Sequence, residues 1–220
     1  MTQRETAISI LSGGMDSTVA TALALREMDV ILALTFDYGQ RAAKNEVAAA
    51  ENFCAQHKIQ HQVIEIPWLK NWTKTSLVNK NQQVPAISAL ELDQNFSADL
   101  ERAKKVWVPN RNGVFLSIAA AAAESLGAEY LIAGFNEEEA ATFPDNSQSY
   151  LEAMNHSLSF STLNQVKLIS PTIRLNKKEI AKTAKHLGIE LSQLWSCYEG
   201  GEQPCGICES CVRQARALAL

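Results

Sequence analysis

Short apolar segments alternate with longer alanine-rich or amphipathic segments along most of the chain. Apolar runs rich in β-branched residues are typical of buried strands. The predicted strands are 7–11, 30–36, 61–66, 129–134 and 166–170. The segments between the strands have the length and composition of helices. The predicted helices are 17–26, 42–58, 114–126, a helix that begins near 147, and 177–187.

This alternation of strand and helix predicts an α/β fold, a Rossmann-like parallel sheet with helices on both faces. Short strand–helix–strand connections favour right-handed crossovers, which bring the carboxyl ends of the strands to one edge of the sheet. With 220 residues and 46% hydrophobic content, the chain is long enough for one main domain with a full core. We expect that domain to span residues 1–190, with a small C-terminal segment, 191–220, packed on it.

The pattern weakens between residues 67 and 105, where two tryptophans, a proline and an acidic patch at 91–101 occur without clear periodicity. A stretch of this length inside an enzyme is often a lid, a substrate loop or a dimer contact. A solvated insertion with one or two short helices is an equally good interpretation. A homodimer therefore stays open at this stage.

The first strand ends in Ser-Gly-Gly-Met-Asp-Ser, residues 12–17, directly before the first helix. Glycines at a strand-to-helix turn let backbone N–H groups face a ligand, and the helix N-terminus favours an anion. The 12–17 loop therefore suits phosphate or pyrophosphate. It contains no Gly-Lys-Ser/Thr, so it is not a Walker A motif, and pyrophosphate as a leaving group fits better than γ-phosphoryl transfer. The alternative is an ordinary turn in which Ser or Asp caps the helix.

Cys197, Cys205, Cys208 and Cys211 lie within fifteen positions near the C-terminus. Two-residue spacing among three of them suits a tight knuckle around one ion, and the fourth completes a tetrahedron. Zinc is the first choice, and an iron–sulfur cluster is the alternative. A closed four-thiolate zinc site is usually structural. Cys54 has no partner at ligand spacing and is interpreted as a core residue.

A second polar corner, Asn110-Arg111-Asn112, stands at the entrance to the helix predicted from 114. Arginine there could pair with phosphate or carboxylate through its planar fork, while asparagine caps the helix. A simple cap with a surface arginine is the alternative.

Net charge and composition indicate which classes of molecule the chain binds. A net charge of −4 and a pI near 5.6 disfavour a large duplex-binding surface, so small-molecule substrates are expected and no direct nucleic-acid partner. The start of the chain has no signal-peptide pattern, and no apolar run approaches membrane-spanning length. We therefore expect a cytoplasmic protein with no membrane contact, in which the cysteines are reduced.

Together these motifs resemble the 7-cyano-7-deazaguanine (preQ0) synthase family of the ATP-pyrophosphatase, or PP-loop, superfamily. The resemblance rests on the 12–17 loop, on Phe-Asp-Tyr-Gly-Gln-Arg at 36–41, on Val-Pro-Asn-Arg-Asn at 108–112, and on the cysteine-rich tail at 195–211. It implies an ATP-dependent C–N ligase that converts 7-carboxy-7-deazaguanine and ammonia to preQ0 in queuosine biosynthesis, through an adenylated intermediate. It also implies one zinc ion per chain, held by the four cysteines, and ATP with Mg²⁺.

The resemblance suggests a role for particular residues. Asp16, Ser17 and Arg111 are the expected catalytic residues, with Asp16 on Mg²⁺ or at the helix cap and Arg111 on the phosphates or the substrate carboxylate. Adenine is expected near Leu11 and Phe36. The residues assigned to the nucleotide are Leu11, Ser12, Gly13, Gly14, Met15, Asp16, Ser17, Phe36 and Arg41.

The chain departs from the family pattern at residues 139–147, where Asp-x-Ser-Gly-Tyr-Pro-Asp-Cys-Arg is usual. Pro144 and Asp145 match, whereas the serine–glycine pair and the arginine do not. A related adenylating enzyme with a different acceptor, a tRNA thiolase, or a non-catalytic zinc-binding module are the alternative functions.

Overall fold

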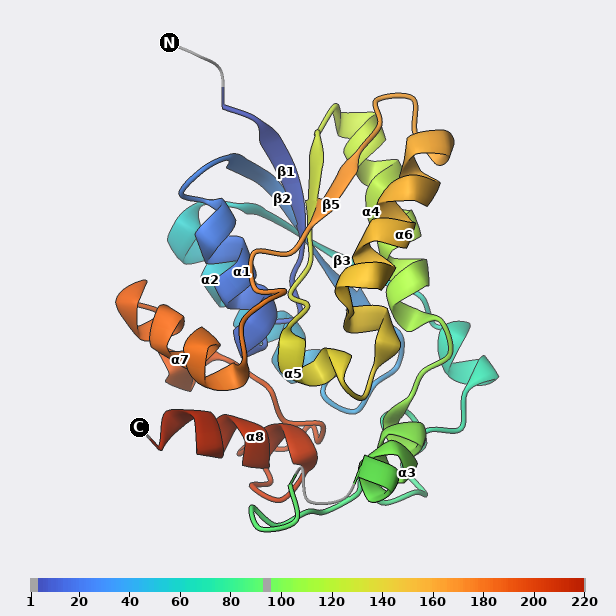
Figure 1. The fold of residues 1–220 in the computed structure, drawn as a ribbon, viewed down its shortest axis with the longest axis vertical. Coiled ribbons are helices and arrows are strands. Elements are labelled where there is room, and N and C mark those ends of the chain that lie inside the picture. The colour runs from blue at the N-terminus through green and yellow to red at the C-terminus, as the bar shows by residue number, and fades with distance from the viewer. Residues whose placement is uncertain (1–3, 93–95, 220) are drawn as a thin grey trace.

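The chain folds around a five-stranded parallel sheet with the strand order β3-β2-β1-β4-β5 (Figure 1). The computed structural model describes residues 4–92 and 96–219. The strands are β1 (Thr6–Ile10), β2 (Asp29–Asp37), β3 (Gln60–Glu65), β4 (Tyr130–Ile132) and β5 (Lys167–Ile169). All five lie within a residue or two of their predicted positions, and the prediction of a parallel sheet is confirmed.

Helices cover both faces of the sheet, as the alternating pattern predicts (Figure 1). The α-helices are α1 (Met15–Ala24), α2 (Ala43–His57), α3 (Phe96–Val106), α4 (Arg111–Leu126), α5 (Glu137–Ala140), α6 (Gln148–Ser161), α7 (Lys177–His186) and α8 (Glu209–Leu218). Single 3-10 turns occur at η1 (Leu69–Trp72), η2 (Pro144–Asn146) and η3 (Leu191–Gln193). None of the described helices is long and apolar enough to cross a membrane.

Two apolar layers sandwich the sheet. On one face, α4 and α6 pack on the strands through side chains such as Leu116 and Leu158. On the other face, α1 and α2 pack through small residues, including Ala20 and Ala50, both fully buried. Because alanine occupies little volume, the helices approach the strands closely, and the sheet holds the loops at its carboxyl edge in fixed positions.

Residues 67–105 contain η1 and α3, which agrees with the interpretation of this stretch as an insertion with short helices. Helix α3 is mostly polar and buries a narrow side that includes Ala103 and Val106, so its position was not predicted. Two other local predictions need correction. The acidic segment 137–140, which follows the predicted strand 129–134 and was not predicted as a helix, forms α5, since Asn136 Oδ1 caps it by accepting a hydrogen bond from the Glu139 N–H at 2.9 Å. Finally, α4 begins at Arg111, and Asn110 precedes it in the left-handed region (φ 51°) without a side-chain cap.

The C-terminal segment packs on the carboxyl edge of the sheet. The Trp195 N–H donates to the Gly13 carbonyl at 2.9 Å, so the tail is fastened directly to the 12–17 loop. Farther on, α8 lies beside α7 and α1, where Ala217 joins Ile180 and Val19 in a buried cluster. The tail thus forms one wall of the region in which the predicted functional residues meet.

Candidate active site

A cavity of about 260 Å³ opens at the carboxyl edge of the sheet. Its walls come from the ends of β1 and β2, the start of α4, the segment from β4 to η2, the start of α7 and the cysteine-rich tail. The predicted site residues that line it are Leu11, Ser12, Gly14, Met15, Asp16, Ser17, Phe36 and Arg111. The predicted nucleotide loop and the arginine of α4 therefore share one enclosure, although almost a hundred residues separate them in sequence.

The 12–17 loop is held in shape by its two serines. The Ser17 hydroxyl lies 3.0 Å from the Ser12 hydroxyl, accepts from the Ser12 N–H at 3.2 Å, and can donate to the Gly14 carbonyl at 3.2 Å. Gly14 stands at the N-cap of α1, so no cap side chain blocks the N–H groups of the first turn. The helix N-terminus therefore presents donors and partial positive charge to the cavity, as an anion site requires.

Two glycines permit close packing around this loop. Gly13 has φ +74°, and a Cβ there would lie 2.6 Å from the Glu46 carbonyl oxygen on α2. Gly13 is not in the cavity wall, so its role is to let the loop pack on α2. A Cβ on Gly134, at the end of β4, would lie 2.5 Å from the Ser17 nitrogen. No larger residue fits at either position without moving the loop.

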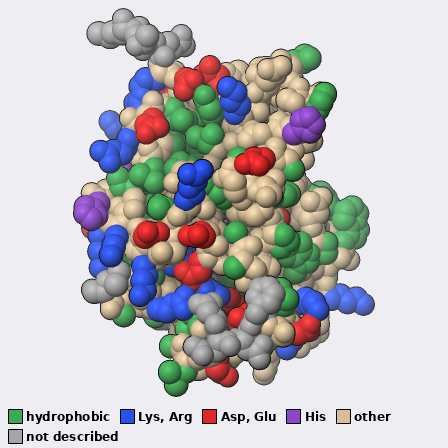
Figure 2. All heavy atoms as spheres, in the orientation of Figure 1, with side chains coloured by type: hydrophobic (Ala, Val, Ile, Leu, Met, Phe, Trp, Pro, Cys, Tyr) green, Lys and Arg blue, Asp and Glu red, His purple; other side chains and the backbone are tan. Residues whose placement is uncertain are grey.

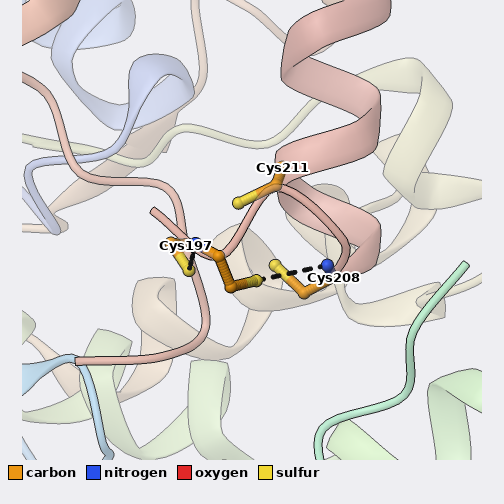
Figure 3. A group of neighbouring side chains, drawn as sticks. Cys197, Cys208 and Cys211 are labelled. Carbon is orange, nitrogen blue, oxygen red and sulfur yellow. Dashed lines mark hydrogen bonds between the residues drawn. The ribbon is translucent and has the colours of Figure 1, made fainter. Parts of the chain in front are cut away.

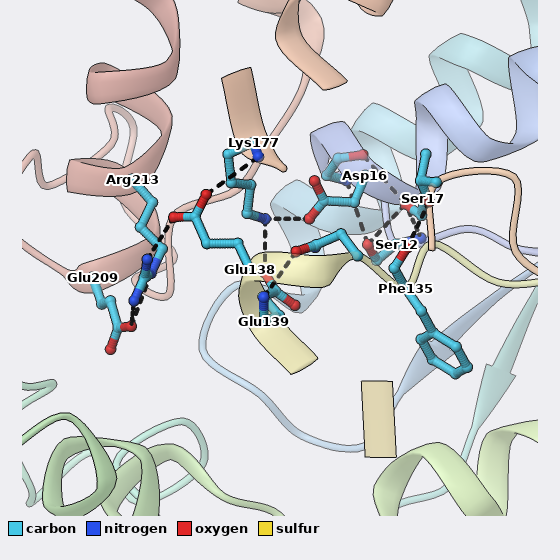
Figure 4. Close-up of polar contacts among 12 residues, drawn as sticks. Ser12, Asp16, Ser17, Phe135, Glu138, Glu139, Lys177, Glu209 and Arg213 are labelled. Carbon is cyan, nitrogen blue, oxygen red and sulfur yellow. Dashed lines mark hydrogen bonds and ion pairs between the residues drawn. The ribbon is translucent and has the colours of Figure 1, made fainter. Parts of the chain in front are cut away.

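The cation that faces this loop was not predicted from the local sequence pattern. Lys177, at the first position of α7, extends its ammonium group between Asp16 and Glu139 (Figure 4). The distance from Lys177 Nζ to Glu139 Oε1 is 2.7 Å, and Nζ also contacts Asp16 Oδ2. No lysine is near the loop in sequence, but the fold supplies one from a helix that starts at the same sheet edge. The capping box of Asn176 and Glu179 was the available signal for that helix start.

Lys177, Asp16 and Glu139 form a charged trio. Burial and their mutual charges determine the pKa values of these groups. Burial raises the pKa of Asp16 to about 6, although Lys177 acts in the opposite direction. Burial alone would lower the pKa of Lys177, but the charges of Asp16 and Glu139 raise it above its usual value. Within the described residues, Asp16 Oδ1 is buried without a hydrogen-bond partner. A buried, unpaired carboxylate oxygen beside an anion loop is suited to a divalent cation.

An adjacent ion-pair network connects the trio to the tail. Glu138 Oε1 accepts hydrogen bonds from Arg213 and Arg216 of α8, each at 2.5 Å, and its Oε2 accepts from the Lys177 backbone N–H at 3.2 Å (Figure 4). Arg213 also bonds Glu209 at 3.0 Å. Glu138 thus joins α5, α7 and α8, and it was absent from the sequence prediction because its partners lie up to 78 residues away.

Arg111 supplies the second positive charge of the cavity. Its Nη1 donates to the Tyr38 hydroxyl at 3.2 Å, and the guanidinium lies 5.8 Å from the centre of the Tyr38 ring. Burial alone would lower the pKa of Arg111, yet the Tyr38 hydroxyl, with Asp145 and Glu46 nearby, raises it. The group stays cationic, as phosphate or carboxylate binding requires.

Arg41 occupies a different place from the one its motif suggested. It does not line the cavity. Its Nη1 bonds both carboxylate oxygens of Glu199 at 2.9 Å, and its Nη2 donates to the carbonyl oxygens of Asn79 and Gln82. These contacts tie the second βα corner to the tail and to the 79–82 segment. The observed geometry therefore gives Arg41 a structural task.

The four tail cysteines converge at one point, and Figure 3 shows three of them, Cys197, Cys208 and Cys211. All four Sγ atoms lie within 4.8 Å of one another, and Cys197, Cys208 and Cys211 are buried. Tetrahedral zinc with Zn–S bonds of about 2.3 Å requires sulfur atoms about 3.8 Å apart, so the cluster fits such an ion. The N–H groups of Cys205 and Glu199 each donate to Cys197 Sγ at 3.3 Å, which also favours thiolate ligands.

Comparison with known proteins gives a consistent family. The family model described as "Queuosine biosynthesis protein QueC" matches residues 6–220. A 7-cyano-7-deazaguanine synthase from Methanosarcina mazei is 48% identical over 96% of this chain and 93% of its own length. One from Carboxydothermus hydrogenoformans is 50% identical over 97% of this chain and 98% of its own length.

Among solved structures, an NMN synthetase from Francisella tularensis aligns with a TM-score of 0.50 at 16% identity, covering 93% of this chain and 71% of that one. At that identity the likeness concerns the fold alone, and it matches the parallel α/β architecture. The relatives, by contrast, match nearly the whole chain at close to half of its positions. The chain therefore belongs to the 7-cyano-7-deazaguanine synthase family.

Proposed function

We propose that this chain converts 7-carboxy-7-deazaguanine, ammonia and ATP into 7-cyano-7-deazaguanine (preQ0), in queuosine biosynthesis, and that the cavity at the sheet edge is its active site. Membership of the family supports the overall reaction. The main evidence for placing the active site here is that the 12–17 loop, Lys177 and Arg111 line one cavity. An anion loop flanked by two buried cations suits the triphosphate of ATP.

A carboxylate has no good leaving group, so one of its oxygens must be activated before ammonia can displace it. A carboxylate oxygen of the substrate attacks the α-phosphorus of ATP, an O–P bond forms, and the bond from the α-phosphorus to the bridging oxygen breaks as pyrophosphate leaves. Ammonia then attacks the carbonyl carbon and AMP departs, which yields the amide. A second ATP activates the amide oxygen in the same way, and loss of AMP with two protons from nitrogen yields the nitrile.

The protein contributes position and charge to these steps. We assign the N–H groups at the start of α1, together with Ser12 and Ser17, to the departing pyrophosphate. Arg111 and Lys177 offset the negative charge that grows on the phosphates. Because its Oδ1 is buried and unpaired in the described structure, Asp16 is the residue that would hold Mg²⁺, which supplies further charge neutralisation when bound. Leu11 and Phe36 would contact the adenine ring.

The four cysteines are proposed to bind one zinc ion with a structural task. The site joins the loop at Cys197 to the start of α8 at Cys208 and Cys211. The same tail contacts the 12–17 loop through Trp195 and the Lys177 trio through Arg213. Holding the tail folded therefore holds one wall of the cavity. On this basis we propose the division into a main domain, 1–190, and a zinc-binding segment, 191–220.

We propose that the substrates are all small molecules and that the chain works without direct contact to nucleic acid. On the face drawn in Figure 2, Lys and Arg side chains lie among Asp and Glu side chains. The net charge of −4 points the same way. A duplex would require a continuous basic surface instead.

The test is incubation of the purified chain with 7-carboxy-7-deazaguanine, ammonium and Mg-ATP, with mass spectrometry of the deazapurine products. The proposal predicts the nitrile together with AMP. A reaction without ammonium is the control, and it should yield no nitrile. If ATP is consumed without nitrile whenever ammonium is present, the acceptor is a different molecule and the proposal is wrong.

A further inference from the structure

Two aromatic rings in the cavity wall have no role in the function proposed so far. Trp107 follows α3, and Phe143 lies between α5 and η2. Their rings are almost parallel, with an interplanar angle of 4° and centroids 6.2 Å apart. Both side chains are half-buried and line the cavity, so the pair is accessible from within.

A second aromatic pair in the same wall provides a comparison. Phe36 and Phe115 stack directly, with centroids 4.1 Å apart at 8°. The centroids of Trp107 and Phe143 are about 2 Å farther apart than that. Two rings that hold a flat heterocycle between them need about 7 Å, twice the ordinary carbon contact distance of about 3.5 Å. The centroids of Trp107 and Phe143 are about 0.8 Å short of that separation, so these half-buried rings must move apart slightly to admit a heterocycle, while Phe36 and Phe115 are in full contact.

A carboxylate stands next to this pair. Asp145 follows Phe143 by two residues and lines the same cavity. Its backbone carbonyl accepts from Asn112 Nδ2 at 3.3 Å, and its Oδ1 accepts from Asn146 Nδ2 at 3.2 Å. A carboxylate accepts two parallel N–H bonds, and the ring N–H and 2-amino group of a guanine-type ring form such a pair of donors.

We infer that the aromatic pair of Trp107 and Phe143 binds the deazapurine ring by stacking, and that Asp145 recognises its N–H and 2-amino edge. This inference rests on the proposed function, since it places that substrate in the cavity. The Phe143 N–H donates to the Glu139 carbonyl at 2.8 Å, so the stacking ring is one turn away from the residue that contacts Lys177. The ring and the phosphates then occupy neighbouring parts of the same cavity.

Steady-state kinetics of paired variants tests the stacking. Trp107→Leu and Phe143→Leu keep apolar volume and remove the aromatic face, while Trp107→Phe and Phe143→Tyr keep it. We expect each leucine variant to raise the KM for 7-carboxy-7-deazaguanine about tenfold or more, the usual cost of losing a base-stacking ring, with the KM for ATP nearly unchanged. The aromatic variants should stay close to wild type. Leucine variants with an unaltered KM for the deazapurine would overturn the stacking.

Asp145→Asn tests recognition of the ring edge. An amide offers one acceptor and one donor, so it complements a ring with a 2-oxo group in place of the 2-amino group. The ratio to measure is the kcat/KM for 7-carboxy-7-deazaguanine divided by the kcat/KM for its 2-oxo analogue. We expect Asp145→Asn to lower this ratio at least tenfold and to use the 2-oxo analogue better than wild type does. A residue that only supports the fold would lower both values alike, and that result would refute the assignment.

Direct binding separates this inference from the proposed function. Titration of the wild-type chain with 7-carboxy-7-deazaguanine should quench tryptophan fluorescence, and Trp107→Phe should lose most of that quench. If the wild type makes the nitrile but the leucine variants bind the acid normally, the inference fails and the function stands. If the acid binds with the expected quench but no nitrile forms, the proposed reaction fails while the ring site stands.

Discussion

Lys177→Met is the variant whose effect can be worked out most fully from the structure. Methionine keeps the length and apolar character of the side chain but removes the ammonium group between Asp16 and Glu139. Loss of one partner from a buried ion pair typically costs about 3–5 kcal/mol, because the remaining charge is left without compensation. Protonation of Asp16 limits that cost, so the effect of the substitution depends on pH.

The raised pKa of Asp16 determines whether stability rises or falls with pH. Burial already raises it from 3.8 to about 6 in the presence of the lysine, so ionising this group disfavours the folded state by about 3 kcal/mol once pH exceeds the folded value. Stability from this group is therefore highest at low pH and falls as pH rises from about 4 to about 6. Without the lysine, the folded pKa rises further, and the fall continues to higher pH.

The assay is urea unfolding of wild type and Lys177→Met at about pH 5.5 and about pH 8. The variant should lose more stability at the higher pH, and it should release no AMP from ATP with the deazapurine acid. Lys178→Met is the matched control, since Lys178 is the next residue of α7 and is exposed. Equal stability and activity of the two variants, or a loss independent of pH, would refute the reasoning.

Three further substitutions test the loop and the tail. Ser17→Ala removes the hydroxyl that bonds Ser12, and it should reduce AMP and pyrophosphate release at least tenfold while Ser149→Ala, an exposed control, has no effect. Cys208→Ser should release the metal, read by elemental analysis, and lower stability by several kcal/mol, whereas Cys54→Ser should leave the metal content unchanged. Gly13→Ala should destabilise the fold by about 1–3 kcal/mol in urea unfolding, because φ is +74° and the new Cβ meets the backbone of α2; unaltered stability would mean that the loop can shift freely.

The sheet and the 12–17 loop were predictable because their signals are local. Apolar runs in 7–11 and 30–36 occur directly before polar corners, and the parallel order follows from short crossovers. The cysteine cluster was equally predictable, since its ligands lie within fifteen positions. For these features, the residues that interact are neighbours in sequence or follow from the strand–helix alternation itself.

The cation at the loop was not predictable in the same way. Lys177 and Asp16 are separated by 161 positions, and nothing in the local pattern distinguishes this lysine from Lys178. Only the packing of α7 beside α1 brings its ammonium group to the loop. Arg41 shows the converse case, because its polar corner suggested nucleotide contact whereas its guanidinium is bound to Glu199 in the structure. The direction of a long side chain depends on tertiary partners that a motif does not show.

In the proposed reaction, an oxygen of the substrate attacks the α-phosphorus of ATP in this cavity. This attack is tested with 7-carboxy-7-deazaguanine whose carboxylate carries a heavy-oxygen label, by mass spectrometry of the AMP released during turnover. We expect AMP that carries one heavy oxygen atom in the complete reaction of the wild type. Without ammonium the adenylate persists, and we expect no sustained release of AMP. Unlabelled AMP, or label found in pyrophosphate, would contradict the proposed attack.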